Sequence, residues 1–70
     1  MKITRESKSI KIEGHIGRWD VIDVGSYKGK EAFLLEHCTY GEDAASLIVD
    51  SSGRVLEDEV YNGFPSEEWN

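Results

Sequence analysis

The sequence predicts a small all-β domain. We expect a five-stranded antiparallel meander, with a curled sheet or small open barrel and a short C-terminal tail packed on it. Apolar residues come in short blocks rich in Ile, Val, Leu and aromatic side chains, and polar turns with glycine separate the blocks. Sequential strands joined by short turns usually pair as neighbours, which favours a meander.

The first strand is expected at residues 8–13, where polar and apolar residues alternate and Ile10 and Ile12 share a face. Gly14 and Gly17 follow and permit a sharp bend or a bulge.

Residues 18–24 form the second expected strand. Simple alternation puts Trp19 and Val21 on one face, and Asp20, Ile22 and Val24 on the other. Neither face is uniformly apolar, which is typical of a central strand or of a bulge near Asp23. The two glycines within residues 25–30 predict the turn that follows.

The third strand is expected at residues 31–37. Helix propensity is also good there, but seven residues make a short helix and the neighbouring segments are strands. As a strand, this segment places Phe33 and Leu35 on one face and Ala32 and Leu34 on the other. A polar turn with solvated acids follows at residues 40–43.

The last two strands are expected at residues 45–50 and 54–61, as a hairpin. In the turn between them, the Asp50 side chain can bond the backbone and Gly53 can take a left-handed conformation.

The domain is expected to span residues 8–70, behind a flexible N-terminal arm at residues 1–7. One face of such a sheet must be covered by curling, by the chain ends or by a second copy. The aromatic candidates for filling it are Trp19, Phe33, Phe64 and Trp69.

Size and cysteine content restrict the setting. A chain of 70 residues builds only a marginal core, and its single cysteine, Cys38, excludes an internal disulfide. A reducing, cytoplasmic location and a core completed by homo-oligomerisation both fit this composition. No apolar run reaches the length of a signal peptide or a membrane span.

Charge is unevenly distributed. Residues 1–30 carry seven basic and four acidic side chains, a sum of +3, and residues 31–70 carry one basic and ten acidic ones, a sum of −9. Ordinary solvated surface is one interpretation, and an acidic face for a basic partner is the other. The total of −6 argues against nucleic acid as the main ligand, although basic residues recur in the N-terminal arm (Lys2, Arg5, Lys8 and Lys11).

His15, His37 and Cys38 are the residues from which a zinc site or a nucleophile–base pair would have to be built. His37 and Cys38 are adjacent, so on a strand they point to opposite faces. None of the usual metal-ligand spacings or phosphate-binding glycine motifs occurs, and we predict no metal, no cofactor and no catalytic residue.

The candidate partner-binding residues are acids and aromatics of the last strand and the tail. Alternation would let Glu57 and Glu59 project together, with Asp58 on the other face. A solvated strand or a blunted sheet edge is the alternative for these acids, and core anchoring is the alternative for the tail aromatics. The full set is Glu57, Asp58, Glu59, Tyr61, Phe64, Glu67, Glu68 and Trp69.

Three strings within residues 18–64 resemble a small domain of large polyvalent proteins from phages and conjugative elements. These strings are W-x-V-I-D, F-L-L-E-H-x-x-Y-G-E-D-A-A and I-V-D-x-x-G-x-V-L-E-D-E-x-x-N-G-F, as they stand in this sequence. The resemblance implies a protein of mobile elements or their bacterial hosts and an accessory binding role, and it implies no catalytic residue.

Three functional hypotheses follow. The first is a non-catalytic, acidic protein-interaction module, with an unidentified protein or a second copy as its partner. The second is a phage-type inhibitor whose acidic face mimics nucleic acid and occupies the basic groove of a host defence protein. The third is a small enzyme, which 70 residues can seldom support because a formed pocket is needed.

Overall fold

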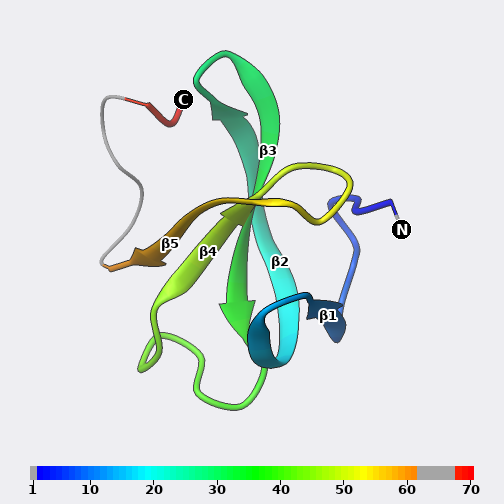
Figure 1. Ribbon diagram of the computed structural model, residues 1–70, viewed down its shortest axis with the longest axis vertical. Helices are drawn as coiled ribbons and strands as arrows, with labels where there is room; N and C mark the ends of the chain where they lie inside the picture. The colour runs from blue at the N-terminus through cyan, green and yellow to red at the C-terminus, as the bar shows by residue number, and fades with distance from the viewer. Residues whose placement is uncertain (1, 62–67) are drawn as a thin grey trace.

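One antiparallel sheet organises the chain (Figure 1). The computed structural model describes residues 2–61 and 68–70. Its strands follow in sequence order: β1 (Ile10–Ile12), β2 (His15–Tyr27), β3 (Lys30–His37), β4 (Ser46–Val49) and β5 (Val55–Val60). The predicted five-stranded meander is therefore confirmed. The described residues include no helix, so none of them forms a helix that could span a membrane.

The centre of the sheet is buried on both faces, because β3 and β4 carry consecutive apolar residues. Phe33 and Leu35 point to one face and Ala32 and Leu34 to the other, as predicted. We call the two resulting cores the first and the second cluster. The buried members of the first cluster are Ile3, Ile12, Trp19, Val21, Phe33, Leu35, Leu47 and Val49. Those of the second are Tyr27, Ala32, Leu34, Ile48 and Val60.

The sheet curls across the second cluster. Tyr27 from the end of β2 packs there together with Val60 from β5, although two strands separate β2 from β5 in the sheet order. Within the described residues β1 and β5 are not hydrogen-bonded to each other, so the sheet stays open.

The N-terminal segment lies against the first cluster. Ile3 is only 1% exposed, and its N–H donates to the Ser51 carbonyl at 2.7 Å. The Val21 N–H donates to the Ser7 carbonyl at 3.0 Å. The segment that we predicted as a flexible arm therefore contributes a core side chain, and burying one such isoleucine is worth about 1.5–3 kcal/mol.

The C-terminal tail pairs with the end of β2, as Figure 1 shows, and its predicted packing on the sheet is confirmed. Ser26 and Asn70 exchange two backbone hydrogen bonds of 3.0 and 2.8 Å, and the Lys28 N–H donates to the Glu68 carbonyl at 2.8 Å. Trp69 covers Gly25, where an added Cβ would lie 2.6 Å from the indole ring. The tail thus covers a stretch of β2 edge that β1, which pairs only with residues 15–19, does not reach.

β2 is longer than predicted at both ends. It begins at His15 and ends at Tyr27, because Tyr27 is buried and pairs with Lys30. The predicted turn at residues 25–30 therefore shrinks to Lys28 and Gly29. Both have positive φ angles, 52° and 80°, as a two-residue type I′ hairpin requires.

A bulge in β2 corrects one face assignment. Val21 pairs with Leu35 and Asp23 with Leu34, so Ile22 is the extra residue, and the bulge predicted near Asp23 is confirmed. Beyond the bulge the alternation is reversed. Val24 consequently packs on the first cluster, on the side of Val21, and the prediction that it shares a face with Ile22 was wrong.

β5 is irregular in the same way. Ser46 pairs with Val60 and Ile48 with Glu57, so two residues, Asp58 and Glu59, lie opposite Leu47 alone. Glu59 has a φ of 52°, in the left-handed region. The alternation that predicted a common face for Glu57 and Glu59 does not hold here, because Glu57 and Val60 flank the bulge on the face of the second cluster.

The strain at Glu59 predicts opposite effects for two neighbouring glycine substitutions. Glu59→Gly should raise the free energy of unfolding by about 0.5–1 kcal/mol, because glycine relieves the left-handed penalty at some entropic cost. Asp58→Gly removes the same charge where φ is not positive, and should lower that energy by about 0.5–1 kcal/mol. Urea unfolding of both variants checks this, and equal destabilisation would contradict it.

The hairpin turn between β4 and β5 is held by Asp50. Its Oδ1 accepts hydrogen bonds from the Ser52 hydroxyl at 2.6 Å, the Ser52 N–H at 2.9 Å and the Arg54 N–H at 3.0 Å. The Ser52 hydroxyl is the main cause that lowers the pKa of Asp50, and the two N–H donors add to it. The predicted role of this side chain in the turn is therefore confirmed.

Acid should weaken the fold through Asp50. A lowered pKa gives stability that is complete above the unfolded value, near 3.8, and is lost as the pH falls through the folded value. Asp50→Asn keeps an acceptor oxygen but cannot titrate, so its stability should fall less than that of the wild type between roughly pH 5 and pH 2. Chemical unfolding at each pH measures this. Asp58→Asn, an equal change on an exposed side chain, should retain the wild-type slope.

Candidate functional site

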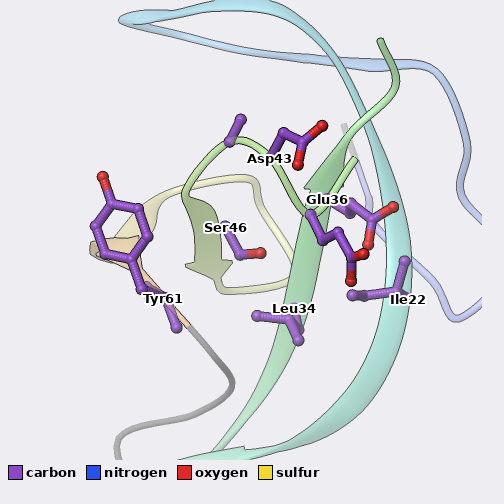
Figure 2. Close-up of a pocket in the computed structure, with 9 residues that line it drawn as sticks. Ile22, Leu34, Glu36, Asp43, Ser46 and Tyr61 are labelled. Carbon is purple, nitrogen blue, oxygen red and sulfur yellow. The ribbon is translucent and has the colours of Figure 1, made fainter. Parts of the chain in front are cut away.

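A hollow of about 570 Å³ opens on the face of the second cluster (Figure 2). It crosses the sheet, since β2, β3, β4 and β5 each contribute at least one lining residue. The lining residues are Ile22, Leu34, Glu36, Glu42, Asp43, Ala44, Ser46, Val60 and Tyr61. We call it the acidic hollow.

The two bulges place apolar side chains at opposite ends of the acidic hollow. Ile22 is the extra residue of the β2 bulge and is 49% exposed, and Tyr61 follows the β5 bulge and is 66% exposed. Figure 2 shows Tyr61 on one side and Ile22 beside Glu36 on the other. Between them, Leu34 and Val60 form a buried apolar floor. Bulges often re-aim a side chain in this way next to functional sites.

Three carboxylates line the hollow. Glu36 comes from the end of β3, and Glu42 and Asp43 come from the loop between β3 and β4. None of the nine lining residues is basic, and within the described part of the chain these carboxylates take no hydrogen bond or ion pair. The hollow therefore offers uncompensated negative charge beside an apolar floor.

His37 holds the loop that carries Glu42 and Asp43. Its Nδ1 accepts hydrogen bonds from the N–H groups of Thr39 and Tyr40, at 3.1 and 3.3 Å. Its carbonyl accepts the Gly41 N–H at 2.8 Å, and the Tyr40 carbonyl accepts the Asp43 N–H at 2.9 Å. Because Nδ1 is an acceptor, the neutral ring carries its proton on Nε2. These bonds fix the loop backbone and therefore the backbone positions from which the Glu42 and Asp43 side chains project.

The His37 ring is itself clamped by aromatic packing. It meets Trp19 edge-on, with ring centroids 5.0 Å apart, and its centroid lies 4.9 Å from that of Tyr40. Gly17 leaves room for the ring, since a Cβ at that position would strike His37 Nε2. Residues from β2 thus set the position of a loop after β3.

A site of this composition suits a cationic group on an aliphatic stem. Lysine and arginine side chains lay their methylene stems along apolar surface and present the charge to carboxylates. No group of three or more His, Cys, Asp and Glu side chains among the described residues is close enough to hold a metal ion.

The predicted partner-binding residues divide into three groups within the described residues, and two more residues lie outside them. Tyr61 lies at the acidic hollow. Asp58 and Glu59 are exposed on the β5 bulge, away from the lining. Glu57, Glu68 and Trp69 turn toward the second cluster, and Phe64 and Glu67 lie outside the described residues.

Glu57 and Glu68 converge on one phenol. The Tyr27 hydroxyl donates to Glu68 Oε2 at 2.9 Å, and this bond is the main cause that raises the pKa of Tyr27, followed by burial and by Glu57. A hydroxyl has a single proton, so Glu57 Oε2 is left buried without a donor among the described residues. Both acids thus belong to the attachment of the tail rather than to open surface.

The residues weighed for catalysis occupy separate environments. His37 serves the loop, and His15 lies at the β1–β2 hairpin. The Cys38 thiol donates to Asp20 Oδ1 at 3.2 Å, and desolvation, followed by Asp20, raises its pKa. A raised pKa keeps a thiol protonated and makes it a poor nucleophile.

Sequence reasoning did not single out Ile22, Glu36, Glu42 and Asp43 as partner-binding residues. The sequence pattern predicted that the acids of the turn are ordinary solvated side chains. It also predicted that Ile22 is an ordinary residue of the second strand. The available signal was the string F-L-L-E-H-x-x-Y-G-E-D, which contains all three acids of the hollow together with His37 and Tyr40.

Comparison with known proteins yields one family. The model of the family described as large polyvalent protein-associated domain 18 matches residues 1–70. No curated protein and no solved structure matches the chain.

Two glycine substitutions separate backbone strain from the His37 contact. Gly14 and Gly17 both have positive φ, 83° and 95°, so alanine at either should cost roughly 1–2 kcal/mol. An added Cβ at Gly14 meets nothing within 4 Å, whereas at Gly17 it would strike His37. Gly17→Ala should therefore cost about 1–3 kcal/mol more and shift the NMR signals of residues 37–43. Equal losses of stability, with unchanged loop signals in Gly17→Ala, would contradict this role of Gly17.

Proposed function

The chain belongs to the large polyvalent protein-associated domain 18 family, and on that premise we propose that it is a non-catalytic protein-interaction module. Its setting is a mobile genetic element or the bacterial host of one, and the cytoplasm is the compartment we expect. The module binds a protein partner through the acidic hollow.

One observation carries the proposal. Three carboxylates that pair with none of the described residues and two exposed large apolar side chains, Ile22 and Tyr61, surround the same hollow. Protein interfaces combine apolar anchors, often tyrosine, with polar groups at the rim. A lone acidic patch would be explained by solubility, but here the acids line a concave site that also contains the buried apolar side chains of Leu34 and Val60.

The non-catalytic part of the proposal is supported by the surroundings of the reactive groups. The cysteine thiol has a raised pKa, and the His37 Nδ1 already accepts two backbone N–H groups. Neither arrangement resembles an activated nucleophile with its base.

Inhibition by nucleic-acid mimicry is the second candidate function. The carboxylates of the hollow would then occupy a basic groove of a host defence protein, and binding would weaken steeply with salt. What favours a general interaction module is the presence of Ile22 and Tyr61 at the hollow, since a mimic depends mainly on charge. Competition between this protein and nucleic acid for the captured partner distinguishes the two.

Removing the charge of the acidic hollow should weaken partner capture. The triple variant Glu36→Gln, Glu42→Gln, Asp43→Asn should recover at least about fivefold less partner from lysates of bacteria carrying the related element, since three partly solvated ion pairs together contribute roughly 1–2 kcal/mol. The matched control is Glu31→Gln, Asp58→Asn, Glu59→Gln, which removes three exposed charges outside the hollow.

Quantitative mass spectrometry of the captured proteins compares the variants with the wild type. Equal losses in the two triple variants would show that only net charge matters and would contradict a site in the hollow. A strict monomer on native mass measurement, with no captured protein, would contradict the interaction module itself.

A further inference from the structure

We infer that the partner presents an extended segment to the acidic hollow, with a Lys or Arg side chain seated among the three carboxylates and an apolar side chain against Tyr61. This inference rests on the proposed function and specifies the chemistry of the bound segment. Three features of the hollow lead to it.

The first feature is direction. The hollow runs from Ile22 in β2 to Tyr61 just after β5, across four neighbouring strands. Three strand spacings of about 4.8 Å make a span of about 14 Å. An extended chain covers that length with roughly four residues, at about 3.3–3.6 Å each. A segment lying across the strands therefore fits without pairing to a sheet edge.

The second feature is polarity along the hollow. Glu36 lies beside Ile22 at the β2–β3 end, and Asp43 lies on the loop between β3 and β4 (Figure 2). Glu42, from the same loop, also lines the hollow. The β5 end is formed by Val60 and the ring of Tyr61. A ligand that fills the hollow therefore needs a cationic group at one end and an apolar group at the other, about four extended residues apart.

The third feature is the separation of this face from the basic residues of the same chain. Ile3 and β1, which lie among the N-terminal basic residues, pack on the first cluster on the opposite face of the sheet. The chain's own N-terminal basic residues therefore do not cover the carboxylates, which stay accessible to a basic group of a partner.

Synthetic pentapeptides test the inference directly. The probe is acetyl-Arg-Ser-Ala-Ser-Leu-amide, with its reverse sequence to cover both chain directions. Peptides with Arg replaced by Glu, or with Leu replaced by Ser, are the controls. Binding is followed by NMR of the ¹⁵N-labelled protein at low salt, where a four-residue contact should give a dissociation constant on the order of 1 mM.

The expected result is a set of shift changes at Ile22, Leu34, Glu36 and Tyr61 with one direction of the probe. The Arg→Glu peptide should show no saturable binding, and the Leu→Ser peptide should bind at least about threefold more weakly and no longer shift Tyr61. The hollow variant Glu36→Gln, Glu42→Gln, Asp43→Asn should bind the probe at least about tenfold more weakly, and the matched control variant should bind it normally.

Other outcomes overturn the inference. Equal binding of arginine amide or spermidine would make the hollow a site for small cations. Shifts at the same residues on raising the protein concentration alone would make a second copy the occupant. If no peptide binds while partner capture still depends on the hollow, the segment chemistry is wrong and the proposed function stands. If capture is also independent of the hollow, both fail.

Discussion

Burial of β3 and β4 on both faces is the constraint on which the rest of the structure depends. Apolar side chains alternate to both sides of these strands, so each face needs a cover that a 70-residue chain has little material to provide. The N-terminal segment supplies Ile3 to one face. The curl of β2 toward β5, together with Trp69, supplies the other. Both chain ends are therefore structural parts of the domain.

This arrangement explains why two of the acids do not form open surface. Glu68 and Glu57 meet the Tyr27 hydroxyl where the tail returns to β2, and one oxygen of Glu57 stays buried without a donor among the described residues. An unsatisfied buried carboxylate oxygen is costly, and it is kept because the tail closes the edge of β2 there. The net charge of residues 31–70 consequently overstates the acidic surface. Open acidic charge remains at the acidic hollow and at the exposed Glu31, Asp58 and Glu59.

The order of strands could be predicted from the sequence because it depends on local signals. Alternation, glycine turns and the Asp50 turn are all encoded within a few residues, and so was the bulge near Asp23. What alternation could not give was the face of each residue beyond a bulge, since one extra residue reverses every later side chain. Alternation therefore predicted the wrong face for Val24, and the common face that it predicted for Glu57 and Glu59 does not hold. The burial of Ile3 depends on a contact with Ser51, 48 positions away in the chain, and has no local signal.

The candidate site was less accessible to prediction than the fold, for a related physical reason. Its acids come from a strand end and a loop, and its apolar ends come from two bulges in strands that are not neighbours. Only the curl of the sheet and the His37 contacts bring these elements together. The left-handed Glu59 comes directly before Val60 and Tyr61 of the hollow. The crowded Gly17 makes room for His37, which holds the loop of Glu42 and Asp43. Strain of this kind persists only where surrounding contacts over-determine it. The bulges of β2 and β5, which make prediction by simple alternation fail, are therefore also the features that place Ile22 and Tyr61 at the hollow.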